Sequence, residues 1–323
     1  MLKKLLTVYA DKGLLKTASM AANYLGLLIL RNAFGCRYRE RRIRSFRMLL
    51  DLQDTGICQE LMINENREEE HIYILRHELK EGMTVLDIGA NIGYYSCVIG
   101  KMIGERGKIY AVEPSVDNFY LLNLNIKLNK LNSIVETFNI GIAGQTGVGR
   151  FYESEKSNWH TFYPKVHHGR SESLIKKSAI DVQVMTVGDF IRGKRRIDLI
   201  RMDIEGYEVE VFKGLVLDLQ DRDLRPKILF ETHRPRYDDM EHSMRDALKG
   251  LFENGYSVKF LVSAGHRLGA YKAFKKRGYA EENMVAYLPN SDESIYERIV
   301  NEDGIELICD TMFTKAALLV REV

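Results

Sequence analysis

Carboxylate side chains accompany the ends of three apolar stretches, each as long as a buried strand. Asp87 lies near the end of residues 83–88, Asp203 follows residues 197–202, and Glu231 follows residues 227–230. Acids at strand ends suit proton transfer and the binding of hydroxyl-bearing or cationic ligands. The residues around these three acids indicate which ligand to expect.

The first acid opens a glycine-containing turn. The sequence D-I-G-A-N-I-G at 87–93 joins a predicted strand to a predicted helix, and Glu113 follows twenty residues later at the end of a second strand. A dinucleotide-binding loop would carry glycine at the position of Asn91, and an acid in the turn would repel a pyrophosphate. An acidic turn attracts an ammonium and a sulfonium group instead. The turn therefore predicts S-adenosylmethionine as the cofactor, rather than NAD.

Six residues are predicted to hold this cofactor. They are Asp87, Gly89, Asn91, Gly93, Glu113 and Asn139. Asp87 is expected to bind the amino group of the methionine part, directly or through water, with capping of the turn as the alternative. Gly89 allows close approach of the cofactor to the backbone, and Glu113 accepts hydrogen bonds from two ribose hydroxyls. Asn139, at the end of a third strand, is predicted to reach the adenine edge.

Four residues are predicted to act on the acceptor. They are His233, Asp203, Glu231 and Glu205. A hydroxyl that attacks a methyl sulfonium must lose its proton, and histidine accepts protons well near neutral pH. His233 is the predicted base; Asp203 or Glu231 in that role, and a purely structural His233, are the alternatives. The same acids are hard ligands for Mg²⁺, but no ligand spacing demands a metal, and we expect none.

A ring-rich segment is the remaining candidate for acceptor binding. Residues 157–163 read S-N-W-H-T-F-Y and contain the single tryptophan of the chain, with His167 and His168 close behind. Aromatic faces suit sugar or macrocycle surfaces. The alternative is a surface loop with a packed tryptophan.

The elements that must position these residues alternate between strand and helix from about residue 68. The predicted strands are 84–88, 108–112, 134–139, 182–185, 197–202, 227–232, 256–262 and 316–320, and the helices are 68–80, 92–103, 115–130, 207–215 and 240–253. This alternation predicts an α/β fold with a doubly wound, mostly parallel sheet covered by helices on both faces. Ligands of such sheets bind outside the carboxyl ends of the strands.

Composition limits the remaining possibilities. The chain has 323 residues, enough for a large core, and a net charge of only +2, which argues against nucleic acid as a partner. Its four cysteines have no C-x-x-C spacing, so neither a zinc site nor a disulfide framework is expected. A reducing, cytoplasmic location is the simplest context.

The charge is unevenly distributed. Residues 1–50 hold 11 lysines and arginines against two acids, a net charge of +9 that leaves −7 for the rest. Residues 1–60 are predicted to form a basic helical extension, either packed on the main domain or contacting a polyanionic partner or the surface of an anionic membrane. The apolar run at 20–30 is too short to span a membrane, and no signal-peptide cleavage site follows it.

Four motifs taken together resemble one known family. They are V-L-D-I-G-A-N-I-G-Y-Y-S at 85–96, A-V-E-P at 111–114, I-D-L-I-R-M-D-I-E-G-Y-E-V-E-V-F-K-G-L at 197–215 and I-L-F-E-T-H at 228–233. Their order resembles the FkbM-type S-adenosylmethionine-dependent methyltransferases over roughly residues 70–265. We assign residues 61–323 to a class I, Rossmann-like methyltransferase domain; the resemblance carries nothing over to residues before 60 or after 265.

The resemblance has further implications for fold and function. It implies seven strands in the order 3-2-1-4-5-7-6 and O-methylation of hydroxyls, often on sugars or polyketides; a glycan, a lipid-linked sugar or a secondary metabolite would be the acceptor. It makes Asp87, Gly89 and Glu113 cofactor residues and places Asp203 with Glu205 at the active centre. Arg201 stands where the family often has lysine. Tyr207 stands where the family often has a small residue, a change that would reshape the acceptor pocket.

Two alternatives remain at this point. An NAD-dependent oxidoreductase or epimerase would carry a three-glycine loop and a Tyr-x-x-x-Lys couple, and neither is present. A non-catalytic Rossmann-like scaffold with a membrane-docking arm would bind no S-adenosylmethionine.

Overall fold

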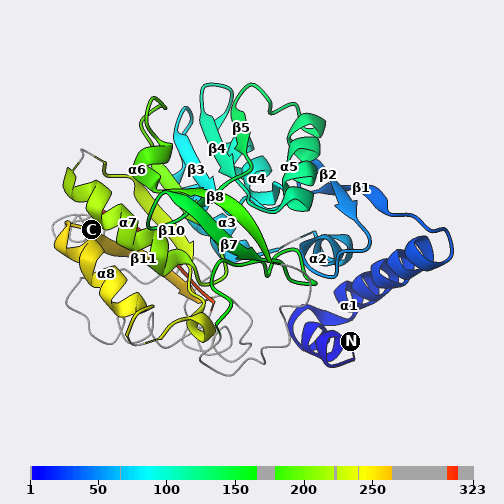
Figure 1. The fold of residues 1–323 in the computed structure, drawn as a ribbon. Helices are drawn as coiled ribbons and strands as arrows, with labels where there is room; N and C mark the ends of the chain where they lie inside the picture. Colours follow the sequence, from blue (N-terminus) through cyan, green and yellow to red (C-terminus); the bar gives the residue numbers. More distant parts are fainter. Residues whose placement is uncertain are drawn as a thin grey trace, which may run out of the picture.

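The computed structural model describes residues 2–65, 67–165, 179–221, 224–238, 240–263 and 304–311. A seven-stranded sheet forms its centre (Figure 1). Its strands are β3 (Thr84–Ile88), β4 (Lys108–Val112), β5 (Val135–Phe138), β9 (Leu199–Met202), β10 (Lys227–Glu231), β11 (Ser257–Ser263) and β12 (Ile305–Asp310). The spatial order is β11-β12-β10-β9-β3-β4-β5. Counted along the chain, this is 3-2-1-4-5-7-6, as the resemblance implied.

The sheet is parallel except at one strand. β12 pairs antiparallel with both β10 and β11, whereas β10, β9, β3, β4 and β5 pair in parallel. The mostly parallel sheet predicted from the sequence is therefore confirmed. The sequence analysis did not assign β12, and the strand predicted at 316–320 lies outside the described residues.

Helices cover both faces of the sheet. They are α3 (Glu69–Glu78), α4 (Tyr94–Ile103), α5 (Val116–Leu128), α6 (Val187–Phe190), α7 (Glu208–Asp221) and α8 (Met244–Glu253). Successive residues of a strand face opposite ways. Val85 belongs to the hydrophobic cluster under α3, α4 and α5, and Leu86 to the cluster under α6, α7 and α8. The fold is thus doubly wound.

A second, three-stranded sheet lies after β5. It is built from β6 (Gly141–Ile142), β7 (Gly147–Tyr152) and β8 (Ala179–Met185) in the order β6-β8-β7. The strand predicted at 182–185 therefore belongs to this small sheet and not to the central one. Its strand β7 leads directly into the ring-rich segment, whose His167 and His168 lie outside the described residues.

The N-terminal extension begins with a long helix but does not remain helical. Helix α1 (Leu2–Asn32) is followed by a hairpin of β1 (Tyr38–Ile43) and β2 (Phe46–Asp51), and then by α2 (Ile57–Ile63). The helical prediction is wrong for residues 38–51. Along β2, Phe46, Met48 and Leu50 are buried while the residues between them are more exposed, which is the two-residue period of a strand.

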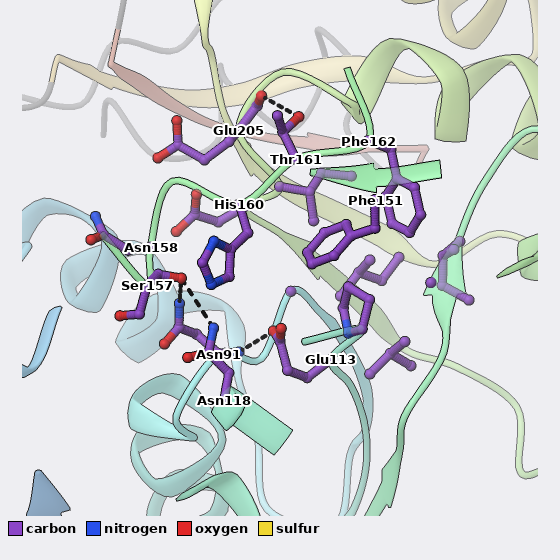
Figure 2. A pocket seen from close by; sticks show the side chains of 18 residues that line it. Asn91, Glu113, Asn118, Phe151, Ser157, Asn158, His160, Thr161, Phe162 and Glu205 are labelled. Atoms are coloured by element: carbon purple, nitrogen blue, oxygen red, sulfur yellow. Dashed lines mark hydrogen bonds between the residues drawn. The ribbon is translucent and has the colours of Figure 1, made fainter. Parts of the chain in front are cut away.

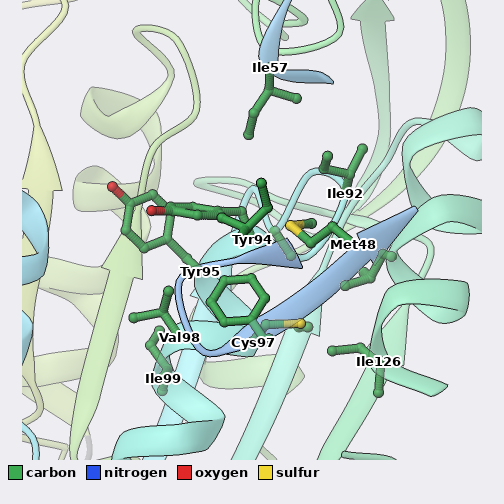
Figure 3. Packing of buried hydrophobic residues seen from close by; sticks show 14 of the residues in the cluster. Met48, Ile57, Ile92, Tyr94, Tyr95, Cys97, Val98, Ile99 and Ile126 are labelled. Atoms are coloured by element: carbon green, nitrogen blue, oxygen red, sulfur yellow. The ribbon is translucent and has the colours of Figure 1, made fainter. Parts of the chain in front are cut away.

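The hairpin shares its core with the sheet. Met48 of β2 and Ile57 of α2 pack among residues of α4 and α5 (Figure 3). The amides of two α5 side chains also bond the β2 backbone: Asn125 Oδ1 accepts from Leu49 N at 2.7 Å, and Asn129 Oδ1 accepts from Arg47 N at 3.0 Å. These contacts satisfy part of an otherwise unpaired strand edge. The division of the chain at residue 60 stays a prediction.

Within the described residues, no helix combines the length and the apolar run needed to cross a membrane.

Candidate active site

Two turns of unusual backbone conformation meet where β3 and β9 end. In the first, Gly89, Asn91 and Gly93 have φ angles of 76°, 52° and 87°. In the second, Glu205 has a φ of 53°, a conformation that costs free energy for any residue with a Cβ atom. A Cβ on Gly89 would lie 2.4 Å from the Asp203 carbonyl oxygen, so glycine at 89 lets the two turns approach each other.

Glu113, after β4, has a buried carboxylate at the edge of a cavity (Figure 2). Its Oε2 accepts from Asn91 N at 2.8 Å and its Oε1 accepts from Ser115 N at 2.9 Å. Burial nevertheless raises the pKa of Glu113 to about 7, against the lowering effect of these bonds. The side chain therefore changes charge near neutral pH.

The ring-rich segment covers the cavity opposite Glu113. The Ser157 carbonyl accepts from Asn91 Nδ2 and from Asn118 Nδ2, both at 3.0 Å (Figure 2). On its other side, Ser157 Oγ donates to Asp54 Oδ2 at 2.8 Å. Asp54 precedes α2, so the N-terminal extension holds the segment in place.

The cavity unites half of the predicted site residues. Those that line it are Gly89, Asn91, Glu113, Asp203 and Glu205. Those outside its lining are Asp87, Gly93, Asn139, Glu231 and His233. Gly93 caps α4 at a point where a Cβ would lie 2.8 Å from Leu122 Cδ1, so glycine there allows α4 and α5 to pack closely; its part in cofactor binding stays a prediction. The side chain of Asn139 donates to the carbonyls of Glu113 and Pro114 at 2.8 and 3.0 Å and braces that turn.

Asp87 is fully buried and is held by two side chains. Ser96 Oγ donates to its Oδ2 at 2.6 Å, and Arg201 Nη1 lies 3.3 Å from its Oδ1. The same guanidinium donates to the Gly89 carbonyl at 3.2 Å and to Asp203 Oδ2 at 2.9 Å. This geometry supports the alternative that Asp87 orders the turn. Burial alone would lower the pKa of Arg201, but Asp203 and Asp87 raise it above its usual value.

The four predicted catalytic residues do come together. His233 Nε2 lies 3.7 Å from Asp203 Oδ1 and 4.0 Å from Glu205 Oε2, and Glu231 lies two residues earlier at the end of β10. His233 Nδ1 lies 3.0 Å from Glu208 Oε1. Burial would lower the pKa of His233, but the carboxylates, Glu208 first among them, raise it well above its usual value. The choice of the base among His233, Asp203 and Glu231 stays a prediction.

Sequence reasoning missed four residues of this site. They are Asp54, Asn118, Arg201 as a bridge, and Glu208. Glu208 had a signal, since it follows D-I-E-G within the family motif and its position suits the first turn of α7. Asn118 and Asp54 act through contacts with Ser157 that no spacing in the chain indicates.

The strand order and the acidic site at the strand ends define a class I, Rossmann-like methyltransferase. The model of the Methyltransferase FkbM domain matches residues 87–258, more than half of the chain, and the protein belongs to this family. S-Adenosylmethionine is the methyl donor of this class, which removes the NAD and non-catalytic alternatives.

Relatives in the family are distant. Methyltransferase sdnD of Sordaria araneosa is 26% identical over 214 residues, which span 58% of this chain and 79% of that protein. Hexuronic acid methyltransferase AglP of Haloferax volcanii is 23% identical over 155 residues, spanning 47% and 58% respectively. A crystal structure of an FkbM methyltransferase from Methylobacillus flagellatus KT shares 16% identity over 56% of this chain and 40% of that one, with a TM-score of 0.37.

Arg201 should be essential for stability. Replacing it with methionine leaves the buried Asp87 carboxylate without its cation, and we expect a loss of about 3–5 kcal/mol in the free energy of unfolding, measured by urea denaturation. Arg201→Lys should lose less stability, because lysine keeps the positive charge. It should still be less stable than the wild-type protein, because lysine lacks the planar guanidinium that reaches both acids. Arg192→Met is the control, since Arg192 is 68% exposed and should change stability by no more than about 0.5 kcal/mol. Equal stability of the two methionine variants would contradict the bridging role.

Proposed function

We propose that this protein is an O-methyltransferase that transfers the methyl group of S-adenosylmethionine to a hydroxyl of a sugar-like or polyketide-like acceptor. One observation carries the proposal: a single cavity extends from Glu113 to Asp203 and Glu205. Among the described residues that line it there are three carboxylates and neither a lysine nor an arginine. Such a lining suits a donor with a positive sulfur and an acceptor with hydroxyl groups.

The Glu113 end of the cavity fits the donor. A buried carboxylate beside the Gly89–Asn91 turn can accept the two hydroxyls of a ribose, and the absence of cations from the described lining leaves a pyrophosphate nothing to pair with. When bound, the donor supplies a methyl group that is attached to a sulfonium. After the transfer, the sulfur of the donor is a neutral thioether. The chain has to orient the two reactants and to accept one proton.

The Asp203 end of the cavity fits the acceptor. As the acceptor oxygen bonds to the methyl carbon, the carbon–sulfur bond breaks with its electrons remaining on sulfur, and the hydroxyl proton passes to the cluster of Asp203, Glu205 and His233. Phe151 and Phe162 form an aromatic wall with ring centroids 4.8 Å apart, and Tyr207 packs on Phe162 at 5.1 Å. Ring faces of this kind pack against the apolar faces of sugars. The hexuronic acid in the name of the Haloferax relative is consistent with a sugar-like acceptor.

A thermal shift experiment tests the donor. S-Adenosylhomocysteine at about 100 times its dissociation constant should stabilise the folded chain by about 2.7 kcal/mol, which raises the melting temperature by several degrees. NAD at the same concentration should leave the melting temperature unchanged. A shift with NAD and none with S-adenosylhomocysteine would overturn the proposal.

The affinity for S-adenosylhomocysteine should depend on pH through Glu113. The pKa of Glu113 is about 7 in the free protein, and only its ionised form accepts from two ribose hydroxyls at once, so binding releases a proton when the pH lies below that value. The dissociation constant, measured by calorimetry, should therefore increase about tenfold from pH 8 to pH 6.

Two variants isolate this effect. Glu113→Gln should bind S-adenosylhomocysteine more weakly and without the pH dependence. Glu136→Gln should keep the wild-type profile, since Glu136 lies on β5 paired with Lys108 and outside the cavity lining. A flat profile in the wild-type protein would exclude Glu113 as the residue that binds the ribose.

We further propose that α1 and the hairpin place the enzyme on an anionic membrane surface. Leu27 is buried and Asn23 Nδ2 donates to the Ile63 carbonyl at 3.1 Å, so one face of α1 is docked on α2. Leu14, Leu25 and Ile29 are 69%, 59% and 46% exposed, and at about 100° per residue they lie on one side of the helix.

Charge complementarity indicates what covers this apolar face. The hairpin that follows α1 carries Arg39 and Arg42, both exposed. Basic side chains near an anionic membrane contribute about 1 kcal/mol each, and an apolar helix face adds the burial of its side chains between the headgroups. An acceptor linked to a lipid would be presented at the same surface.

Vesicle sedimentation tests this surface. At low salt, the full chain should bind vesicles made of phosphatidylglycerol and phosphatidylcholine. It should bind vesicles of phosphatidylcholine alone much more weakly. Leu25→Asp with Ile29→Asp should abolish binding, whereas Leu217→Asp, a substitution of an equally exposed leucine on α7, should not. Unchanged sedimentation of the double variant would refute the docking surface. A dimer that the same double substitution dissociates would identify a second copy as the occupant.

A further inference from the structure

The ends of β9 and β10 bring together three side chains that metals use as ligands. Asp203, Glu231 and His233 each offer one ligand atom, and these atoms all lie within 4.8 Å of one another. Asp203 directly follows β9, Glu231 is the last residue of β10, and His233 lies two residues beyond it. The sequence has no metal-binding spacing because the three ligands come from two separate strands.

His233 is held in the orientation that a metal ligand requires. Its Nδ1 lies 3.0 Å from Glu208 Oε1, and the fully buried Glu208 also accepts from Ile204 N and from the Tyr237 hydroxyl at 3.2 and 3.3 Å. A carboxylate on one imidazole nitrogen fixes the ring so that the other nitrogen faces the metal. The Nε2 atom of this 7% exposed histidine makes no hydrogen bond within the described part of the chain and faces Asp203 and Glu205 at 3.7 and 4.0 Å.

Asp203 is oriented in the same manner. Arg201 Nη2 bonds its Oδ2 at 2.9 Å, and Oδ1 is the oxygen that faces His233. Each of these two residues thus has a buried partner on its far side, and its other atom, Nε2 or Oδ1, faces the same point. A cation that binds at Nε2 would displace the proton carried there.

We propose that Asp203, Glu231 and His233 bind one divalent cation of the Mg²⁺ and Mn²⁺ class. Two carboxylate oxygens and one imidazole nitrogen form a hard, mixed ligand set that leaves positions open for water or substrate. Ligands about 2.1 Å from such a cation are separated by about 3–4 Å, so the cluster has to contract by less than about 2 Å. This proposal departs from the sequence-based expectation that the site contains no metal.

The cation would act on the acceptor. Asp203 also lines the cavity, so a cation bound to it would lie at the acceptor end. A hydroxyl oxygen bound to a divalent cation loses its proton more readily, and a cation with two open positions orients a vicinal diol or a hydroxy acid. This role rests on the proposed function, whereas the binding of the metal does not.

Titration with Mn²⁺ tests the site. The full chain, freed of metal by a chelator, is titrated with Mn²⁺ at pH 8, and free Mn²⁺ is measured from its electron paramagnetic resonance signal. We expect one saturable site per chain, with Mg²⁺ in excess displacing the Mn²⁺. Glu231→Gln and Asp203→Asn should each weaken binding by at least tenfold, and Glu208→Gln, which changes the partner of His233 and none of the proposed ligands, by about tenfold.

Control measurements separate this site from surface binding and from the proposed function. Asp181→Asn removes an exposed carboxylate of β8 that pairs with Arg150, and it should leave Mn²⁺ affinity unchanged. Glu231→Gln should retain the thermal shift with S-adenosylhomocysteine, which shows that the variant is folded and that the donor site is intact. The metal site is refuted if the wild-type chain shows no saturable binding, or if Glu231→Gln and Asp203→Asn bind Mn²⁺ as tightly as Asp181→Asn. If S-adenosylhomocysteine does not raise the melting temperature of the wild-type protein, that result would count against the proposed function and not against the metal site.

Discussion

The site depends on one buried guanidinium. Arg201 lies on β9, and its two terminal nitrogens bond Asp87 of the neighbouring strand β3 and Asp203, which directly follows β9. Without this cation, two carboxylates would lie close together away from water, and one of them would have to take up a proton. With it, the turns after β3 and β9 are fixed to each other, and the Gly89 carbonyl is fixed as well. The ring of Tyr95, 4.1 Å from the guanidinium, completes its enclosure.

Burial has opposite results at the two ends of the cavity. Asp203 is desolvated, which would raise its pKa, but Arg201 and then His233 lower the pKa below its usual range. Glu113 is desolvated too, and its partners are backbone amides and the Asn118 side chain, which carry no full charge; its pKa rises to about 7. The carboxylate at the Asp203 end is therefore stabilised in its charged form, whereas the carboxyl group at the Glu113 end changes its charge near neutral pH.

Much of the fold could be predicted from the sequence because its signals are local. Strands such as Thr84–Ile88 are continuous apolar runs, and the glycines at 89 and 93 mark the turn that follows. The hairpin at 38–51 was mistaken for helix because its many arginines obscure the two-residue alternation of Phe46, Met48 and Leu50. Strand β12 was missed because its assignment depends on pairing with β10 and β11, which only the folded sheet provides.

The site was predictable in composition but not in geometry. The strand-end rule brought Asp203, Glu205, Glu231 and His233 together, since parallel strands present their carboxyl ends at one edge. Local spacing gave no indication that Asp87 pairs with a cation of the neighbouring strand, or that Glu208 fixes the imidazole of His233. Those contacts join residues 114 and 25 positions apart, and only the three-dimensional packing determines them.

The ring-rich segment, which covers the cavity as its roof, connects the N-terminal extension to the residues that line the cavity. Ser157 is bonded on one side to Asn91 and Asn118, which border the cavity, and on the other to Asp54, which also accepts from the backbone of Gly56 and Cys58 at the start of α2. Helix α2 in turn supports α1, whose exposed face we propose to lie on a membrane. Because Asp54 holds the roof through only two donors of Ser157, that link is weaker than the buried Arg201 bridge beneath it. The contacts of Ser157 with Asp54 on one side and with Asn91 and Asn118 on the other thus link the N-terminal extension to the residues that line the cavity.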